Sequence, residues 1–227
     1  LFKSGDASPL EATRAALERI DRFNDEVNAY VYVDREGAED AARASARRWG
    51  QGKPLSPIDG VPTSLKDLTE CKGMPAREGS LTTGTAKCEQ DAPPARMLRE
   101  AGAVLLGKTN TPEFGWKAVT DNRVFGPTRN PWDTRLTPGG SSGGAGAATS
   151  AGLGHIGHGT DIAGSVRYPA YACGIQGLRP THGRIPMFNQ TGGDRPIGGQ
   201  LMAVSGPLAR SVDDLRLGLE GMSGYAP

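Results

Sequence analysis

The sequence has no excess of charge of either sign and no long hydrophobic run. Its 227 residues carry 26 Lys and Arg against 25 Asp and Glu, which gives a net charge of +1 without any block of like charge. This balance excludes an extended nucleic-acid-binding face and suits a small neutral or weakly charged substrate. No stretch approaches the roughly 20 apolar residues of a membrane span, and no signal segment opens the chain. We therefore expect a cytoplasmic protein that binds neither nucleic acid nor membrane.

Cysteine is scarce. Cys71, Cys88 and Cys173 have no C-x-x-C spacing, and three is an odd number for a disulfide framework. These features argue against a structural zinc or a redox pair, and they fit a reducing compartment. Cys173 is expected to be a small buried packing residue.

Histidine is equally scarce, which limits a Ser-His-Asp mechanism to His155, His158 and His182. None of the three has a distinguishing context. His155 and His158 are three residues apart, so on a strand they would face opposite sides and could not form a metal pair. We interpret them as ordinary residues at a strand edge, and we expect neither a metal nor a cofactor.

Glycine, in contrast, is abundant. The chain has 33 glycines, about twice the usual share, and they crowd between positions 139 and 199. Backbone loops rather than side chains would shape a site in such a region, which favours an enzyme over a binding module.

Two serines lie in this glycine-rich region, Ser141 within residues 139–144 and Ser165 within residues 159–167. Upstream, residues 60–67 read as a strand that ends in Lys66. Cleavage of an amide needs an activated nucleophile, a proton acceptor and donors aimed at the carbonyl oxygen. The three side chains could supply the first two of these requirements.

The set of Lys66, Ser141 and Ser165 resembles the Ser-Ser-Lys triad of the amidase signature family. Further similarity covers residues 101–115, 167–184 and 205–211, so it extends over nearly the whole chain. One departure is Ala163, which stands where the family usually has glycine. If that position needs a positive φ, alanine would add about 1 kcal/mol of strain.

The resemblance implies a role for each site residue. Ser165 attacks the carbonyl carbon, Ser141, reached through a cis peptide bond, relays its proton, and a neutral Lys66 accepts that proton and later returns it to the leaving amine. The oxyanion would be held by the backbone N–H groups of Ile162, Ala163, Gly164 and Ser165. Residues that support the site would be Gly140, Ser142, Gly143, Asp161 and Arg167.

A lysine that acts as a base cannot be an ordinary lysine. The usual lysine pKa is about 10.4, so a neutral amine near pH 7 to 8 requires desolvation or neighbouring donors. The apolar run before Lys66 is compatible with burial. A carboxylate at Asp67 would raise the lysine pKa, but neighbouring strand residues face opposite sides, so we expect Asp67 to point away.

Three other glycine patterns do not predict function. Residues 102–109 match G-x-x-x-x-G-K-T, but their interior reads as a buried strand, whereas a phosphate loop follows a strand and opens a helix. Residues 152–157 match G-x-G-x-x-G, but a helical stretch precedes them and a turn follows. The G-x-S-x-G matches within residues 139–144 arise from a run so rich in glycine that chance explains them.

The remaining patterns predict an α/β protein with helices on both faces of a sheet. Ser8, Pro9 and Glu11 form a capping box at the start of a helix that runs to about residue 23. A strand over residues 27–33 and a helix over 36–49, stopped by Gly50, follow. Asp91 is expected to cap a helix through Glu100, and residues 103–106 form another strand. With the resemblance, this predicts the mixed sheet of the amidase signature fold, as one domain over residues 1–227.

Length adds one expectation, because amidase signature enzymes are roughly twice as long as this chain. We expect the chain to represent their N-terminal half and to be incomplete at its C-terminus. The residues that select the acyl group would then lie in the missing half and in the loop of residues 187–200.

Three functions are compatible with these features. The first is an amidase that hydrolyses a linear carboxylic amide. Its partner would be the small amide substrate, and the protein could form a homodimer. The second is the glutamine-hydrolysing subunit of a transfer-RNA-dependent amidotransferase. The third is a catalytically inactive scaffold, suggested by Ala163 and by the length of the chain.

Overall fold

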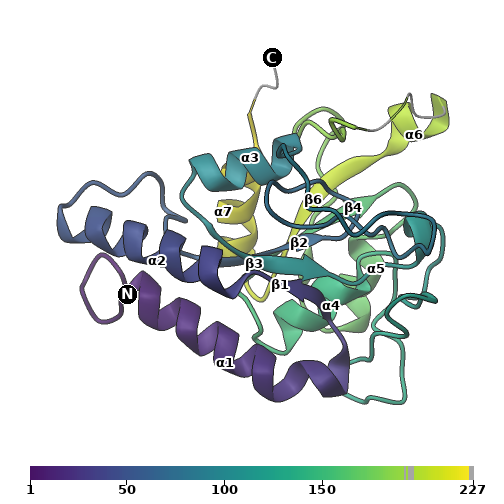
Figure 1. The fold of residues 1–227 in the computed structure, drawn as a ribbon, viewed down its shortest axis with the longest axis horizontal. Helices are drawn as coiled ribbons and strands as arrows, with labels where there is room; N and C mark the ends of the chain where they lie inside the picture. The colour runs from purple at the N-terminus through teal and green to yellow at the C-terminus, as the bar shows by residue number, and fades with distance from the viewer. Residues whose placement is uncertain (192, 194–196, 225–227) are drawn as a thin grey trace.

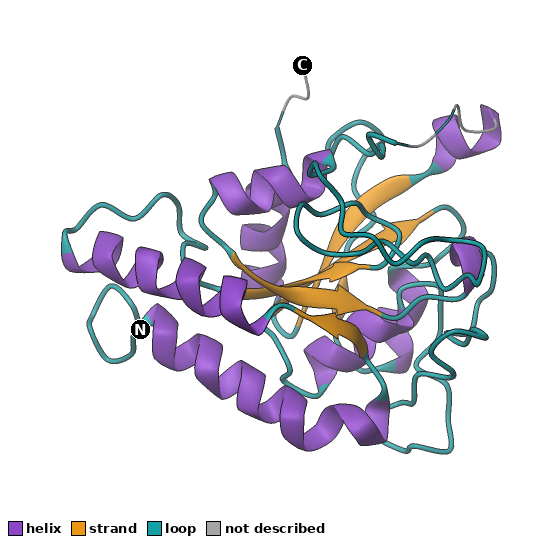
Figure 2. Cartoon of the chain, viewed as in Figure 1, coloured by secondary structure: helices purple, strands orange, loops and turns teal. Residues whose placement is uncertain are grey.

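The computed structural model describes residues 1–191, 193 and 197–224, which form a mixed six-stranded sheet with helices on both faces (Figures 1 and 2). The strand order is β1-β3-β2-β4-β6-β5. The strands are β1 Tyr30–Val33, β2 Pro62–Lys66, β3 Val104–Thr109, β4 Ile156–Asp161, β5 Gln176–Gly177 and β6 Val204–Ala209. The α/β class and the mixed sheet predicted from the sequence are confirmed.

The central strands β3, β2 and β4 run parallel, and the outer strands β1, β6 and β5 pair with their neighbours antiparallel. Every residue of β2, β3 and β4 is buried, as expected for parallel strands covered on both faces. Because the three strands are parallel, their carboxyl ends meet at one edge of the sheet. Lys66 and Asp161 lie at that edge.

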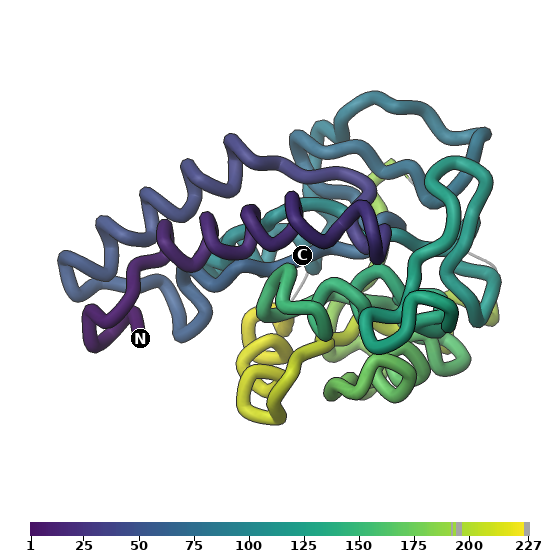
Figure 3. Tube along the Cα trace, turned by 90° about the horizontal axis from the view of Figure 1, so that it is seen from below, coloured from purple at the N-terminus to yellow at the C-terminus, as the bar shows by residue number. Residues whose placement is uncertain are grey.

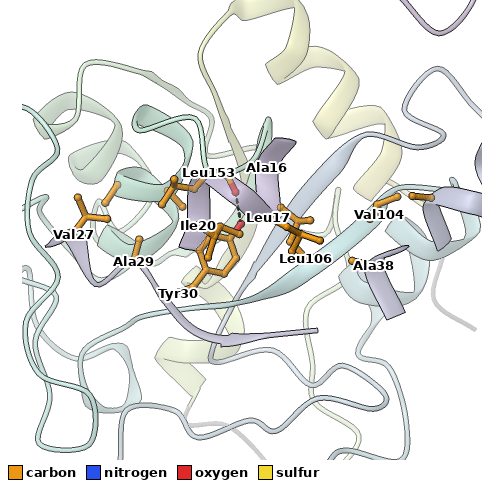
Figure 4. Packing of buried hydrophobic residues seen from close by; sticks show 13 residues of the cluster. Ala16, Leu17, Ile20, Val27, Ala29, Tyr30, Ala38, Val104, Leu106 and Leu153 are labelled. Atoms are coloured by element: carbon orange, nitrogen blue, oxygen red, sulfur yellow. Dashed lines mark hydrogen bonds between the residues drawn. The ribbon is translucent and has the colours of Figure 1, made fainter. Parts of the chain in front are cut away.

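The helices divide between the two faces of the sheet. Helices α1, α2 and α4 pack on one face, where Leu17, Tyr30 and Leu106 belong to the core cluster shown in Figure 4. Helices α3 and α7 pack on the other face around Leu65 and Leu98. The helices are α1 Pro9–Val27, α2 Arg35–Gly50, α3 Pro93–Glu100, α4 Gly143–Ser150, α5 Arg167–Ala172, α6 Ile197–Met202 and α7 Val212–Met222, with one 3-10 turn at Glu113–Gly115.

Helix α1 begins as predicted and ends later than predicted. Ser8 Oγ accepts from the N–H of Glu11 at 3.1 Å, and the Glu11 carboxylate accepts from the N–H of Ser8 at 2.8 Å. The helix continues to Val27, where Asn28 adopts a left-handed conformation with φ 49°. As a result, β1 begins only at Tyr30. Helix α1 lies beside α2 in the view of Figure 3.

Helix α3 shows that one predicted cap is wrong. The helix begins at Pro93 after Ala92, and no side chain caps it. The Asp91 carboxylate instead accepts from the N–H of Lys72 at 2.7 Å and from Arg99 at 2.9 Å. Asp91 therefore joins the helix to the preceding loop.

The glycine patterns without a predicted function are part of ordinary secondary structure. Residues 104–109 form β3. Residues 152–155 connect α4 to β4, and residues 156 and 157 are the first two of β4. The prediction that His158 is a strand-edge residue is wrong, because it lies fully buried in the interior strand β4 with Nε2 3.1 Å from Ser205 Oγ. Within the described ranges, no helix is long and apolar enough to span a membrane.

Candidate active site

Lys66 is the last residue of β2, and its side chain is fully buried. Its Nζ donates to Ser141 Oγ at 2.7 Å and to Thr160 Oγ1 at 2.9 Å. The structure therefore joins two of the three predicted triad residues by a direct hydrogen bond, and it adds a hydroxyl from β4 as the second partner.

Burial lowers the pKa of Lys66 to about 7, and the negative charge of Asp161 opposes this shift. A lysine with this pKa is neutral in about half of the molecules near neutral pH. Asp67 faces away, as its position after Lys66 on the strand predicts, and its Oδ1 lies 3.3 Å from Lys108 Nζ. Desolvation thus changes the basicity of Lys66, as the apolar run before it suggests.

Hydrogen bonds from two elements hold the loop that carries Ser141. Thr120 Oγ1 donates to the Gly139 carbonyl at 2.9 Å and accepts from the N–H of Gly143 at 3.0 Å. Ser142 Oγ donates to the Thr160 carbonyl and accepts from the Thr160 N–H, both at 3.2 Å. The peptide bond before Ser141 is cis, as the resemblance implies, and Ser141 is 2% exposed.

Ser165 lies on the turn that follows β4, and one backbone bond joins this turn to the Ser141 loop. The N–H of Ser142 donates to the Ser165 carbonyl at 3.1 Å. Ser165 is half-buried, whereas Ser141 and Lys66 are buried. Its Oγ has no hydrogen-bond partner among the described residues. The hydroxyl predicted to attack therefore belongs to a half-buried residue, whereas the predicted relay Ser141 and base Lys66 are buried, and the described residues show no hydrogen bond between the two serine hydroxyls.

Asp161 organises the turn of residues 162–166. Its carboxylate accepts from the N–H groups of Gly164 at 2.8 Å, Val166 at 3.1 Å and Arg167 at 3.3 Å, and from the Arg167 guanidinium at 2.9 Å and 3.1 Å. Burial would raise the pKa of Asp161, but these hydrogen bonds lower it to about 2. Asp161 is therefore ionised at neutral pH and fixes the backbone around Ser165.

Within the described residues, three of the four predicted oxyanion donors in the turn of residues 162–166 are free to bind an oxyanion, and the fourth is not. The Gly164 N–H is already donated to Asp161, whereas those of Ile162, Ala163 and Ser165 have no acceptor within the part of the chain that the structure describes. Only Gly164 in this turn has a positive φ, at 113°. Ala163 therefore needs no left-handed conformation, and the strain considered for alanine does not arise.

The site also includes two residues to which the sequence analysis assigned no role. Thr160 lies within the segment of residues 159–167, but the pattern did not predict its bond to Lys66. Thr120, which supports the Ser141 loop, lies outside every motif considered. Thr160 is buried because β4 pairs with β2 and β6. Only the assembled sheet reveals it. No group of three or more His, Cys, Asp or Glu among the described residues is placed to hold a metal ion.

Comparison with known proteins gives three kinds of match. The model of the family Amidase matches residues 11–227. The chain is 43% identical over 227 residues to an indoleacetamide hydrolase of Bradyrhizobium diazoefficiens, covering all of this chain and 43% of that protein. It is 40% identical over 227 residues to one subunit of the glutamyl-tRNA(Gln) amidotransferase of Salinispora arenicola, covering all of this chain and 45% of that protein.

Solved structures agree with these matches. A bacterial aryl acylamidase of the amidase signature family superposes with a TM-score of 0.87 at 32% identity, over 99% of this chain and 46% of that one. A 6-aminohexanoate cyclic dimer hydrolase superposes with a TM-score of 0.85 at 36% identity, over 99% and 45% of the two chains. The chain thus spans less than half the length of these relatives. It belongs to the amidase signature family.

Proposed function

We propose that this chain carries the hydrolytic centre of an amidase that cleaves the C–N bond of a small linear carboxylic amide. The observation that carries this proposal is the bond of 2.7 Å between Lys66 Nζ and Ser141 Oγ, made by a lysine whose pKa burial lowers to about 7. A buried amine that can be neutral, hydrogen-bonded to a serine beside a half-buried serine, suits general-base activation of a nucleophile.

The first half of the reaction forms an acyl-enzyme. Ser165 Oγ attacks the carbonyl carbon while its proton passes to Ser141 Oγ, and the Ser141 proton passes to Lys66 Nζ. The N–H groups of Ile162, Ala163 and Ser165 are the proposed donors to the oxyanion, because they are the ones that Asp161 does not use. Collapse of the tetrahedral intermediate breaks the C–N bond, and the proton held by Lys66 returns through Ser141 to the leaving amine.

The second half consumes water. A water molecule takes the place of the amine, loses its proton to Lys66 through Ser141, and attacks the ester carbon. Ser165 leaves with that proton, and the carboxylic acid is released. Lys66 is again neutral at the end, so each cycle consumes one amide and one water.

The test is labelling with a fluorophosphonate, followed by intact-mass analysis and peptide mapping. We expect one adduct, on Ser165, that is lost in Lys66→Ala. The matched control is Lys53→Ala, which removes an exposed lysine and should leave labelling unchanged. A folded sample without an adduct would contradict the proposed centre, and an adduct on another serine would contradict the role of Ser165.

A second function is favoured by the identity of 40% to a subunit of a glutamyl-tRNA(Gln) amidotransferase. In that case the amide would be glutamine, and a partner protein would receive the ammonia. Hydrolysis of glutamine in preference to other amides, together with a stable complex after copurification, would support this function. The inactive scaffold is the less favoured alternative, because Lys66, Ser141 and Ser165 are all present.

The proposal also concerns the shape of the substrate and the compartment of the protein. One similar protein is a hydrolase of the 6-aminohexanoate cyclic dimer, so a substrate screen should compare linear with cyclic amides. The three cysteines are unpaired, which supports a reducing compartment, and we propose the cytoplasm.

A further inference from the structure

A second lysine is as deeply buried as Lys66, one strand away. Lys108 lies on β3 with no exposed surface, and its Nζ is 3.3 Å from Asp67 Oδ1. The same Nζ donates to the carbonyls of Thr69 at 2.7 Å and Pro75 at 3.2 Å. Asp67 is 1% exposed, and its Oδ2 has no hydrogen-bond partner among the residues that the structure describes. Lys108 is therefore the counter-ion of a buried carboxylate that directly follows Lys66.

The sheet places this ion pair on the face opposite to the Lys66 side chain. Lys108 pairs with Leu65 in the parallel register, so both face the layer of α3 and α7. The N–H of Asp67 donates to the Thr109 carbonyl at 3.0 Å and continues the ladder by one residue. Asp67 and Lys66 are thus held rigidly next to each other but on opposite faces.

The other charged and titratable groups around Lys66 are already accounted for. Asp161 is matched by Arg167, and Arg179 Nε lies 3.6 Å from the same carboxylate. The buried imidazole of His158 is neutral, because burial and the nearby lysines lower its pKa to about 3. Near Asp67, Arg77 contributes its backbone N–H at 3.3 Å and its positive charge. Lys108 is the cation in direct contact with the Asp67 carboxylate.

We propose that Lys108 is a positioning residue for Lys66: it cancels the charge of the adjacent Asp67, so that Lys66 can give up its proton while it is buried. This inference rests on the proposed function, because it explains how a base can operate beside a carboxylate. An unbalanced negative charge on the residue next to Lys66, in an interior without water, would favour the protonated form of Lys66.

A purely structural role for Lys108 makes a different prediction. The bonds to Thr69 and Pro75 tie residues 69–75 to the sheet, so loss of Lys108 would lower stability in either case. Only the electrostatic role predicts that the titration of Lys66 moves, and that it moves in opposite directions when each partner of the pair is removed.

The experiment is an NMR titration of the chain with 13C-labelled lysine, read at Cε between about pH 5 and about pH 11. The Lys66 signal is assigned by its absence in Lys66→Ala. In Lys108→Met we expect its midpoint to rise by about one pH unit, and in Asp67→Asn we expect it to fall by about one pH unit. In the double variant Lys108→Met/Asp67→Asn the midpoint should return close to that of the wild type.

The matched control is Arg48→Met, on helix α2, whose partner Asp59 lies three residues before the start of β2. It also removes the cation from a buried carboxylate, since Arg48 binds Asp59 at 2.6 Å and 2.8 Å and the Asp59 side chain is fully buried. It should therefore destabilise the fold without moving the Lys66 midpoint. If Lys108→Met does not fold, Asp67→Asn decides alone.

An unmoved midpoint in a folded Lys108→Met or Asp67→Asn, or shifts of the same sign in both, would overturn the inference. This readout needs no turnover, so it can be separated from the test of the proposed function. An adduct on Ser165 with an unmoved midpoint leaves the function intact and removes the role of Lys108. If the Lys66 midpoint moves in opposite directions in the two variants but no adduct forms on Ser165, the electrostatic effect of Lys108 stands and the proposed hydrolytic function fails.

Discussion

The carboxyl ends of β2 and β3 each bury a lysine completely, and the two lysines have opposite surroundings. Lys66 donates to two hydroxyl groups, those of Ser141 and Thr160. Lys108 faces a carboxylate and two backbone carbonyls. Carbonyl and carboxylate oxygens only accept hydrogen bonds, and the three around Lys108 match the three N–H donors of an ammonium group. Hydroxyl groups can accept from an ammonium or donate to a neutral amine.

This difference distinguishes two lysines that are equally buried. Burial lowers the pKa of Lys66, whose hydroxyl partners can accept from an ammonium group or donate to a neutral amine. At Lys66 the proton can move to or from the partners without leaving an unsatisfied group. At Lys108 the carboxylate and the two carbonyls can only accept hydrogen bonds from the amino group. Substitution of the two lysines should therefore have opposite consequences for stability.

The largest expected effect comes from Lys66→Met. We expect amide hydrolysis or fluorophosphonate labelling to fall by roughly 10²-fold to 10⁴-fold, because the general base is lost. The free energy of unfolding at pH 6 should stay the same or rise, because a buried ammonium is replaced by an apolar side chain. Labelling kinetics and urea unfolding on the same samples measure both effects.

The ionisation of Lys66 should also make the stability of the fold depend on pH. The pKa of Lys66 is about 7 in the folded chain, against an ordinary value of 10.5. The unfolded chain therefore binds more protons between these values, so wild-type stability should rise as pH increases through this interval. Lys66→Met should lack that rise. A variant that loses stability at pH 6 would contradict the comparison.

Lys108→Met should have the reverse effect on stability. Removal of one partner from a buried ion pair costs about 3 to 5 kcal/mol, because the other charge remains buried without compensation. We expect a loss of this size in urea unfolding at pH 7. If Lys108→Met and Lys66→Met changed stability equally, the two environments would not differ in the way described.

Asp161→Asn tests how much the ionised carboxylate of Asp161 contributes to stability, measured by urea unfolding between about pH 2 and about pH 7. The pKa of Asp161 is about 2 in the folded chain, against an ordinary value of 3.8. Its contribution, about 2 kcal/mol, should be present above pH 4 and lost as pH falls toward 2. Asp161→Asn should lose that amount at pH 7 and show a flatter acid profile. Asp40→Asn, which changes a side chain that is 67% exposed, is the control and should have little effect.

The smallest expected effect is that of Thr160→Val. It removes one of the two hydroxyl partners of Lys66, which should destabilise the fold by about 1 kcal/mol and lower labelling by about tenfold. Thr13→Val is the matched control, because Thr13 is also buried but its hydroxyl has no partner in the described part of the chain. Equal losses of stability and of labelling at both positions would show that the hydrogen bond between Thr160 and Lys66 contributes to neither.

Local signals in the sequence predicted the parts of the fold that depend on neighbouring residues. The Ser8 capping box and the strand that ends at Lys66 were predicted correctly, since both depend on a few adjacent residues. The boundary of α1 was missed because Asn24 receives the N–H groups of Ala29 and Tyr30 and prolongs the turn. A side chain that reaches five or six residues ahead leaves no periodic pattern.

The site was predicted in part, because its chemistry comes from strands that are distant in the sequence. The contact between Lys66 and Ser141 agrees with the roles inferred from the resemblance. The contact with Thr160, the burial of His158 and the ion pair of Lys108 required knowledge of the strand order. Asp91 was assigned as a cap from its position alone, but a carboxylate binds whichever donors the tertiary structure brings closest.

The glycines at the start of α4 let the helix backbone lie directly against neighbouring backbone and short side chains, and this close approach sets the position of Ser141. A methyl group on Gly144 would lie 2.4 Å from the backbone N of Asn110, and one on Gly143 would lie 2.2 Å from Thr120 Oγ1. The helix therefore rests on main chain and on short side chains, without a deformable layer between them. An added methyl group would push the start of α4 away from these atoms, and it would displace the loop that carries Ser141 away from Lys66. The distance between Ser141 and Lys66 therefore depends on how closely the backbone at the start of α4 can approach its neighbours.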